Sequence, residues 1–258
     1  MQVAVITGAA QGIGRKTAEV LAERGYALAL VDTQAMAATA EAVRGLGTPE
    51  APLELVGDVS DAAAVTRWAA AVAQRWGHAD VLVNNAGISF ILPAEDFDLA
   101  RARRVLEVNL IGPMLLSQAF GRMMLAQASG SIINVSSVAG LQGIDDRSVY
   151  NATKHGLIGF TRTLAAEWGG RGVRCNAVCP GWVKTEMDDS AQASGLYTDA
   201  DITGRVPMGR FALPEDVARA IAFLADPVES SFINGVALPV DGGWTADGSW
   251  QSLRMAQR

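Results

Sequence analysis

The sequence predicts an α/β protein in which helices cover both faces of a doubly wound, seven-stranded parallel sheet. Short runs rich in Val, Ile and Leu alternate with helical patterns almost from end to end. These runs lack the alternation of polar and apolar residues that is typical of a strand with one solvent-exposed face. Alternating strands and helices give parallel strands joined by right-handed crossovers. Because no linker, repeat or low-complexity tract interrupts the pattern, we expect a single domain over residues 1–258.

Seven strands and six helices are predicted. The strands are expected at Val3–Thr7, Ala27–Asp32, Leu53–Gly57, Val81–Asn84, Ser131–Val135, Arg174–Val178 and Ala237–Val240. The helices are expected at about Gly12–Arg24, Ala35–Leu46, Asp61–Trp76, Leu99–Ala126, Val149–Trp168 and Pro214–Leu224. Two segments depart from the alternation of strands and helices. Residues 185–207 are polar and are expected to form a mobile flap, and residues 244–258 form a tail. Ligands of doubly wound sheets bind beyond the carboxyl ends of the strands, where a flap can close over them.

Composition and charge exclude several classes of protein. The net charge of −6 argues against nucleic acid as a partner, because phosphates must be met by Lys and Arg. Although 50% of the residues are apolar, no run approaches the roughly 20 apolar residues of a membrane helix. The chain begins directly in a strand pattern, so we expect no signal peptide and a cytoplasmic protein.

Cysteine and histidine give no sign of a metal site. Cys175 and Cys179 stand in an apolar stretch, which favours buried thiols over a disulfide or a metal pair. His78 and His155 are far apart in sequence, and neither belongs to a ligand motif. We therefore expect no metal.

The turn after the first strand carries a cluster of glycines that predicts a nucleotide site. Residues 7–14 read TGAAQGIG, which places Gly8, Gly12 and Gly14 in the spacing G-x-x-x-G-x-G, with Gln11 and Ile13 among them. Glycine is needed where the chain turns tightly and its backbone approaches a pyrophosphate at a helix N-terminus. The cluster alone is weak evidence, but its position between a strand and a helix makes it strong.

The second predicted strand ends at Asp32, eighteen residues after Gly14. A carboxylate at this place can accept both ribose hydroxyls of the adenosine and repel a 2′-phosphate. Basic residues that would bind that phosphate are missing, since Gln11 stands in the glycine loop and Thr33 and Gln34 follow Asp32. The alternative is that Asp32 caps the next helix. The pattern favours NAD as the cofactor.

Tyr150 and Lys154 form the pair Y-x-x-x-K on a predicted helix. Four residues apart, they share one face of that helix. A phenol titrates near 10, but a neighbouring ammonium together with the positive nicotinamide of NAD favours the phenolate and lowers its pKa. The tyrosine can then act as a general base toward an alcohol or as a general acid toward a ketone. A surface tyrosine beside an exposed lysine is the alternative.

Taken together, the motifs resemble those of the classical short-chain dehydrogenase/reductase family, whose members have a Rossmann-type fold. The resemblance runs in order from residue 3 to about residue 244. Besides the glycine loop, it rests on Asp58-Val59, Asn84-Asn85-Ala86-Gly87, Asn109, Ser137, Tyr150 with Lys154, Pro180-Gly181 and Pro239-Val240-Asp241-Gly242-Gly243. It implies an NAD-dependent enzyme that acts on CH–OH groups.

The resemblance also implies roles for individual residues. Ser137, thirteen residues before Tyr150, would hydrogen-bond the reacting oxygen, and Lys154 would also bind the nicotinamide ribose. The remaining cofactor contacts would come from Asp58 and Val59 at the adenine, from Asn85, Ala86 and Gly87 along the cofactor, and from Pro180, Gly181, Val183 and Thr185 near the carboxamide.

Asn109 would complete the catalytic tetrad of the family, in which its backbone carbonyl holds a water molecule that relays protons through Lys154. The sequence offers a physical reason for this role. Pro113 lies four residues later and has no N–H, so it cannot donate the helical hydrogen bond to the Asn109 carbonyl. We expect that carbonyl to be free and the helix to be kinked there.

The substrate is less well determined, and three interpretations within the family stay open. A polyol, sugar or sugar-acid dehydrogenase is favoured, because Asp32 predicts NAD and NAD-linked members usually run oxidatively. A ketoreductase for acyl-carrier substrates ranks lower, since residues 125–129 offer no basic side chain to an acidic carrier and only Arg171 is suitable. The acidic residues of the flap would also repel such a carrier; they are Glu186, Asp188, Asp189, Asp199 and Asp201. A secondary-alcohol or hydroxysteroid dehydrogenase is the third interpretation.

Outside catalysis, the chain could be an NAD-binding scaffold or redox sensor, because a fold alone does not prove activity. Such a protein would be expected to have lost Ser137, Tyr150 or Lys154, and all three are present. We therefore favour the enzyme.

Arg147 is a candidate substrate residue beside Tyr150. With Ser148 as the expected helix cap, Arg147 lies just outside the first turn and can point into the cleft, where its guanidinium offers a planar fork to a carboxylate. The segment 147–150 also resembles that of short-chain enzymes that oxidise keto-deoxy sugar acids. The alternative is a surface ion pair with Asp145 or Asp146.

The resemblance further implies a homo-oligomer, foremost a homotetramer. Family members pair through the long helices that correspond to Leu99–Ala126 and Val149–Trp168, and through the last strand. Both helices carry apolar residues on more than one face, at Met114, Leu115, Leu116, Leu157, Ile158 and Phe160. The alternative is that all of these are internal. We also expect the tail, with Trp244 and Trp250, to pack on a neighbouring subunit near its active site.

Overall fold

The computed structural model describes residues 1–185 and 198–249. Within them, seven strands form one sheet in the order β3-β2-β1-β4-β5-β6-β7, and all neighbours are parallel. The strands are β1 (Val3–Thr7), β2 (Ala27–Asp32), β3 (Leu53–Val56), β4 (Val81–Asn84), β5 (Gly130–Val135), β6 (Val173–Pro180) and β7 (Ala237–Val240). The predicted doubly wound parallel sheet is confirmed. Its strand order reverses between β1 and β4, where such sheets bind ligands.

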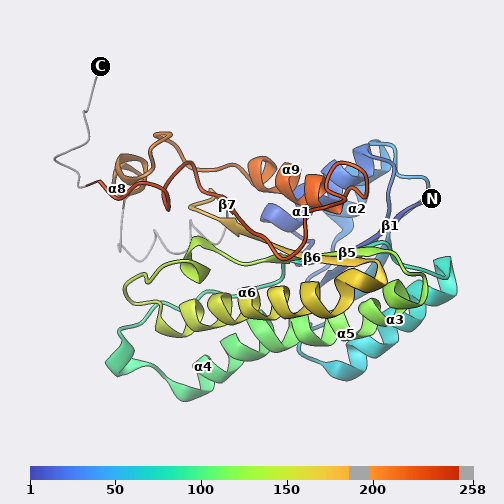
Figure 1. The fold of residues 1–258 in the computed structure, drawn as a ribbon, viewed down its shortest axis with the longest axis horizontal. Coiled ribbons are helices and arrows are strands. Elements are labelled where there is room, and N and C mark those ends of the chain that lie inside the picture. The colour runs from blue at the N-terminus through green and yellow to red at the C-terminus, as the bar shows by residue number, and fades with distance from the viewer. Residues whose placement is uncertain (186–197, 250–258) are drawn as a thin grey trace.

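Helices cover both faces of the sheet, as Figure 1 shows. One face carries α1 (Gly12–Glu23), α2 (Ala37–Arg44) and α9 (Pro214–Ala225). The other carries α3 (Ala62–Trp76), α4 (Leu99–Leu106), α5 (Gly112–Ala126) and α6 (Ser148–Trp168). Shorter helical segments are η1 (Ala94–Asp96), η2 (Glu107–Ile111), η3 (Val138–Gly140), η4 (Gly169–Arg171) and α8 (Asp199–Arg205).

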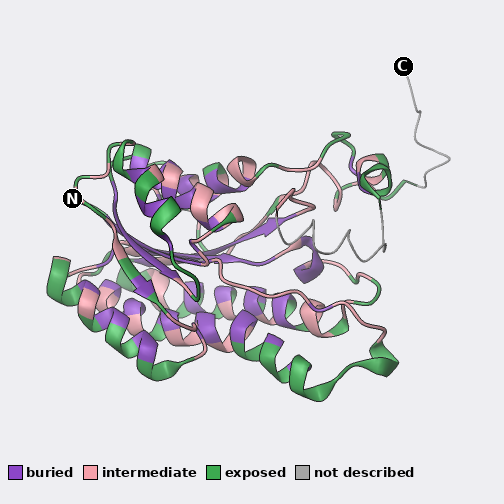
Figure 2. Cartoon of the chain, turned by 180° about the vertical axis from the view of Figure 1, so that it is seen from behind, coloured by how far each residue is buried: buried purple, intermediate pink, exposed green. Residues whose placement is uncertain are grey.

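Each central strand sends alternate side chains into two separate cores. In β1, Val3 and Val5 join the core that contains Phe120 of α5, whereas Ala4 and Ile6 join the core on the other face. Figure 2 shows buried residues concentrated on the sheet and on the helix faces turned toward it. Full burial of a large apolar side chain contributes about 1.5–3 kcal/mol, so both layers stabilise the strand ends that form the site.

The structure corrects the helix boundaries at three places. The predicted helix Leu99–Ala126 is interrupted by the π-helical segment η2, before which α4 ends and after which α5 begins. Ser148 does not cap α6: it is the first helical residue, and the preceding residue has the N-cap position without a side-chain hydrogen bond. Residues 185–207 also contain α8, which we did not predict; it begins with a capping box between Thr198 and Asp201 and buries Ile202.

The other predicted bounds lie within two residues of the observed ones. Glu186, Asp188, Asp189 and Trp250, which we assigned to the flap and the tail, lie outside the described residues. Trp244 of the tail has the Arg205 guanidinium over its ring at 5.2 Å, within the same chain. In the described part of the chain, we find no helix with both the length and the apolarity needed to cross a membrane.

Candidate active site

A cleft of about 550 Å³ opens at the carboxyl ends of the strands and brings the predicted site residues together. It is lined by the predicted residues Gly8, Gln11, Gly12, Ile13, Asp32, Asp58, Val59, Asn85, Ala86, Gly87, Ser137, Arg147, Tyr150, Lys154, Pro180, Gly181, Val183 and Thr185. Two predicted residues do not line it, Gly14 and Asn109. Both lie next to residues that do line it, Gly14 beside Gly8 and Asn109 beside Gly87.

The glycine loop between β1 and α1 has the backbone that a phosphate site needs. Gly8 has φ +67°, and a Cβ there would lie 2.8 Å from the Asn85 amide nitrogen. A Cβ on Gly14 would lie 1.9 Å from the Gly8 carbonyl oxygen. Gly14 therefore allows the first turn of α1 to pack on the loop, whereas Gly8 supplies the positive φ that other residues resist. The N-terminus of α1 then faces the cleft, with N–H groups suited to an anion.

Thr7 and Asn85 hold this loop against the end of β4. The Thr7 hydroxyl accepts hydrogen bonds from the backbone N–H groups of Asn85 and Ala86, each at 3.0 Å. The Asn85 amide donates in return to the carbonyl oxygens of Thr7 at 2.9 Å and Gly8 at 3.1 Å. The two strand ends at the reversal of the strand order are thereby locked together. The cradle fits a dinucleotide such as NAD(P).

Asp32 stands at the end of β2 with both carboxylate oxygens engaged by the backbone. One oxygen accepts from Ala10 N–H at 3.0 Å and the other from Gln34 N–H at 3.0 Å. The N-cap position of α2 is Met36, so the alternative that Asp32 caps this helix is wrong. Thr39, buried on α2, donates to the carbonyl oxygens of Ala9 at 2.9 Å and Ala10 at 3.3 Å. The end of the cleft that contains Asp32 is therefore braced from two sides.

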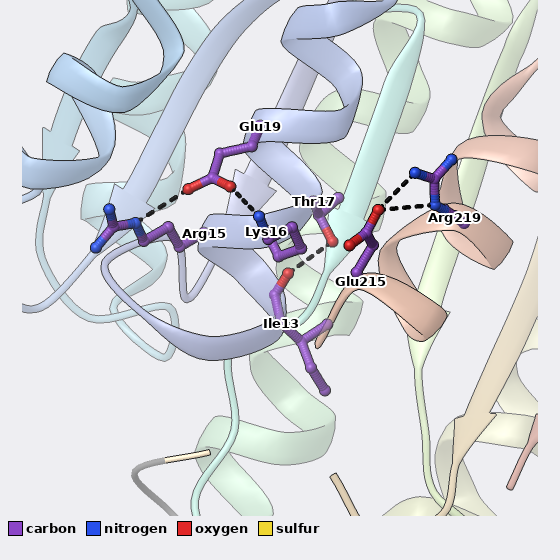
Figure 3. Close-up of polar contacts among 7 residues, drawn as sticks. All are labelled: Ile13, Arg15, Lys16, Thr17, Glu19, Glu215 and Arg219. Atoms are coloured by element: carbon purple, nitrogen blue, oxygen red, sulfur yellow. Dashed lines mark hydrogen bonds and ion pairs between the residues drawn. The ribbon is translucent and has the colours of Figure 1, made fainter. Parts of the chain in front are cut away.

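The basic residues nearest the glycine loop lie on its outer side. Arg15 and Lys16 follow the loop on α1 and both pair with Glu19, as Figure 3 shows. They line a separate hollow rather than the cleft that contains Asp32. Glu19 partly neutralises both charges.

Asp58 belongs to an ionic cluster that no sequence motif indicated. Its carboxylate pairs with Arg104 of α4 and accepts from the Ser60 backbone at 2.9 Å and hydroxyl at 2.7 Å. Burial raises the pKa of Asp58, but the Ser60 and Arg104 hydrogen bonds outweigh it, so the pKa lies below its ordinary value. Arg104 also lines the cleft. No short sequence spacing predicts this contact, because Asp58 and Arg104 are 46 residues apart.

Ser137, Tyr150 and Lys154 converge at the other end of the cleft. The Ser137 hydroxyl lies close enough to Tyr150 to lower the pKa of its phenol, and the Lys154 Nζ lies 5.5 Å from the centre of the Tyr150 ring. Burial raises the pKa of the phenol, whereas the Ser137 hydrogen bond and the positive charge of Arg147 lower it, and the net direction is upward. The sequence predicted a lowered pKa from Lys154 and the nicotinamide together; within the chain itself, Ser137 and Arg147 exert the lowering.

Lys154 is almost fully buried and donates to the Val135 carbonyl at 2.8 Å. Burial lowers its pKa to about 8, because a low-dielectric site disfavours the ammonium. The Ser136 hydroxyl donates to the Lys154 carbonyl at 3.0 Å and so fixes α6 against the end of β5. Near neutral pH, Lys154 is therefore mostly protonated, and it can release its proton at a slightly higher pH.

Asn109 lies within the π-helical segment η2 and ties it to the loop after β4. Its side chain accepts from Ile88 N–H at 2.8 Å and donates to the Ile88 carbonyl at 2.9 Å. A Cβ on Gly87 would lie 3.3 Å from Asn109 Oδ1 and 3.7 Å from Lys154 Nζ, so Asn109 stands close behind the wall beside the lysine. The helix is irregular where Pro113 led us to expect a kink, and π-bulges are frequent at functional sites.

Arg147 lies in the cleft, with its guanidinium over the Trp182 ring at 5.2 Å. The alternative surface pair is not formed, since among the described ion pairs none joins Arg147 to Asp145 or Asp146. Trp182 belongs to none of the predicted motifs. Its position after Pro180-Gly181, at the end of β6, is the signal that could have indicated it.

The two cysteines are free and buried, as predicted. Burial raises the pKa of Cys175 to about 12 and that of Cys179 to about 11. Neither thiol is a nucleophile at neutral pH.

Comparisons with known proteins agree with this geometry. A family model described as enoyl-(acyl carrier protein) reductase matches residues 8–245. The chain is 42% identical to a D-threitol dehydrogenase of Mycolicibacterium smegmatis, over 95% of this chain and 93% of that protein. It is 43% identical to a cis-4-hydroxycyclohexanecarboxylate dehydrogenase of Sinomonas cyclohexanicum, over 95% of this chain and 97% of that protein.

A solved structure has the same fold. It is described as an NAD(P)-dependent gluconate 5-dehydrogenase from Beutenbergia cavernae with NADP bound at low occupancy. It superposes with a TM-score of 0.88 at 40% identity, covering 95% of this chain and 97% of that chain.

Proposed function

This chain belongs to the classical short-chain dehydrogenase/reductase family, enzymes that act on CH–OH groups, and we propose that it is an NAD-dependent dehydrogenase of polyols, sugars or sugar acids. The observation that carries the proposal is the convergence of Ser137, Tyr150 and Lys154 at one end of the cleft. When bound, NAD supplies an acceptor for the hydride of the carbinol carbon. The protein supplies binding, orientation and proton transfer.

Each catalytic residue has a role that its contacts support. Tyr150 removes the proton from the substrate hydroxyl, and in the reverse direction its phenol returns it. Ser137, which lies close enough to Tyr150 to lower the pKa of its phenol, holds the reacting oxygen beside the phenol. Lys154, whose Nζ lies 5.5 Å from the centre of the Tyr150 ring, binds the nicotinamide ribose and, together with the positive nicotinamide of bound NAD, favours the phenolate. Asn109 holds the segment beside Lys154 in place, and its backbone carbonyl positions the water that passes protons to Lys154.

NAD rather than NADP is the proposed cofactor, because the Asp32 carboxylate is fixed at the ribose end by two backbone N–H groups. It cannot turn away from a 2′-phosphate without losing them, and a charge-assisted hydrogen bond is costly to leave unmade. Arg15 and Lys16, which could attract that phosphate, lie in a separate hollow. The NADP in the related structure is the reason to test this point directly.

The proposed substrates carry secondary hydroxyls, as do the molecules named for both relatives. Threitol is a neutral polyol, whereas hydroxycyclohexanecarboxylate adds a carboxylate. A panel of polyols, aldonates and hydroxy acids, each offered with NAD and with NADP, tests the proposal through the absorbance of the reduced nicotinamide. Oxidation of at least one such alcohol with NAD supports it. NADP-dependent reduction of acyl-carrier ketones alone would replace it with the acyl-carrier ketoreductase.

We also propose that the protein forms a homotetramer through α4, α5, α6 and β7. Three of the six apolar residues that the sequence offered for the interface are excluded, because Leu116, Leu157 and Ile158 are buried within the chain. Met114, Leu115 and Phe160 are only partly buried. Phe232, in the loop before β7, is fully exposed, and such an aromatic side chain is a natural interface residue.

A further inference from the structure

The end of the cleft that contains Tyr150 and Ser137 also contains a guanidinium stacked on an indole. Arg147 and Trp182 both line the cleft, and the centre of the Trp182 ring lies 5.2 Å from the Arg147 guanidinium carbon. Arg147 comes from the start of α6, three residues before Tyr150, whereas Trp182 follows β6. The charge of Arg147 is close enough to lower the pKa of the Tyr150 phenol. The pair therefore lies beside the place where a substrate hydroxyl meets Tyr150.

Backbone contacts hold the main chain of both residues in place. Arg147 forms a bridge with Leu92, and its carbonyl accepts from Asn151 N–H at 2.7 Å. The Trp182 carbonyl accepts from Ala212 N–H at 2.9 Å, which ties the segment after β6 to the loop before α9. Both residues are half-buried. The pair is thus preorganised, which reduces the ordering cost of binding a ligand.

A guanidinium placed over an aromatic ring can keep its hydrogen-bonding edge available. A guanidinium over a ring uses its flat face, whereas its N–H donors point outward in its own plane. Within residues 1–185 and 198–249, no carboxylate lies at ion-pair distance from Arg147. Ile88, Val138 and Ile144 line the same cleft. A cation beside apolar walls, with its planar fork unsatisfied, matches a small anion joined to a carbon skeleton.

We propose that Arg147 and Trp182 form a subsite for a substrate carboxylate, so that the preferred substrates are small hydroxy acids rather than neutral polyols. Arg147 binds the carboxylate through its N–H edge, and Trp182 holds the guanidinium plane in position. With the carboxylate fixed there, the hydroxyl a few bonds away is presented to Tyr150 and Ser137. This inference rests on the proposed dehydrogenase function and narrows it to one substrate class.

Binding of a matched pair of unreactive probes tests the subsite. Cyclohexanecarboxylate and cyclohexanecarboxamide have nearly the same shape and differ in charge. Calorimetric titration of the full chain, with and without NADH, should show that the carboxylate binds about ten- to a hundred-fold more tightly than the amide, as expected for a charged hydrogen bond. Arg147→Gln, which keeps a polar side chain but removes the charge, should abolish this preference. Trp182→Leu should weaken carboxylate binding by a few-fold and spare the amide.

Arg101→Gln is the matched control. Arg101 also stacks on an aromatic ring, that of Phe90 at 5.4 Å, but it does not line the cleft. This variant should keep the full preference for the carboxylate. Equal binding of the two probes, no binding of the carboxylate, or an undiminished preference in Arg147→Gln would each overturn the subsite.

The same variants separate failure of the subsite from failure of the proposed function. If the wild-type protein oxidises alcohols with NAD but its carboxylate preference does not depend on Arg147, the subsite is wrong and the dehydrogenase stands. If the carboxylate binds through Arg147 but no alcohol is oxidised with either cofactor, the subsite stands and the dehydrogenase is wrong.

Discussion

The Lys154 ammonium lies 5.5 Å from the centre of the Tyr150 ring and is held there by the Val135 carbonyl at 2.8 Å. Burial that places a lysine beside a phenol also costs stability, because the ammonium loses its hydration. The site therefore combines a functional charge with a local instability, which is a known compromise at active sites.

Replacing Lys154 with Met should stabilise the fold near neutral pH while impairing catalysis. The pKa of Lys154 is about 8 in the folded chain, against an ordinary value of 10.5 for lysine. Below about pH 8 the folded state carries the whole penalty, of the order of 3 kcal/mol. Between those two values the unfolded state alone keeps the proton, so wild-type stability rises with pH and the advantage of Lys154→Met shrinks. Urea unfolding at about pH 7 and about pH 10 measures this, and a gain that does not shrink would contradict it.

Replacing Asp32 with Ala should narrow the preference for NAD over NADP. The carboxylate that repels a 2′-phosphate is removed, while the backbone donors of Ala10 and Gln34 that held it become available to that phosphate. Adding Thr33→Arg should admit NADP, because a guanidinium beside the ribose binds the phosphate directly. The measurement is kcat/KM for both cofactors with one alcohol. Equal use of NAD and NADP by the wild-type protein would contradict our interpretation of β2.

Replacing Thr39 with Val should weaken NAD binding although Thr39 does not line the cleft. The isosteric change removes the hydroxyl that donates to the Ala9 and Ala10 carbonyls, and a neutral hydrogen bond contributes about 0.5–1.5 kcal/mol. The KM for NAD should rise a few-fold with kcat nearly unchanged. Thr39→Ser should restore it. A loss confined to thermal stability would assign Thr39 a purely structural role.

The protein in solution should be a tetramer of its 27.0 kDa chain. Light scattering measures the mass directly, and Phe232→Asp, at a fully exposed position, should shift the population toward smaller species. A monomeric wild-type protein would contradict both the homotetramer and the expected packing of the tail on a neighbouring subunit.

The sequence predicted what depends on local patterns and missed what depends on contacts between distant segments. The strand bounds follow from apolar runs, and the glycine loop follows from the backbone that a phosphate site requires. Arg104 was missed because its partner Asp58 lies 46 residues away. Helix α8 was missed because Ile202 is its one buried residue, too little for an apolar period. Trp182 and Arg147 meet only after β6 and α6 have packed together.

The central claim is that Tyr150 transfers the proton when an alcohol is oxidised with NAD. Wild-type oxidation should rise with pH as the phenol ionises, with a midpoint below 10 once the positive nicotinamide offsets the burial that raises the pKa of Tyr150 in the chain itself. Tyr150→Phe removes only the ionisable group.

The decisive measurement is kcat of Tyr150→Phe on one oxidisable alcohol, together with the Kd for NAD. We predict that kcat falls by about 10²–10⁴-fold, the usual contribution of a general base, while the Kd stays within about two-fold, because a phenyl ring keeps the packing. A Phe variant that turns over substantially would contradict the claim and remove Tyr150 from the reaction.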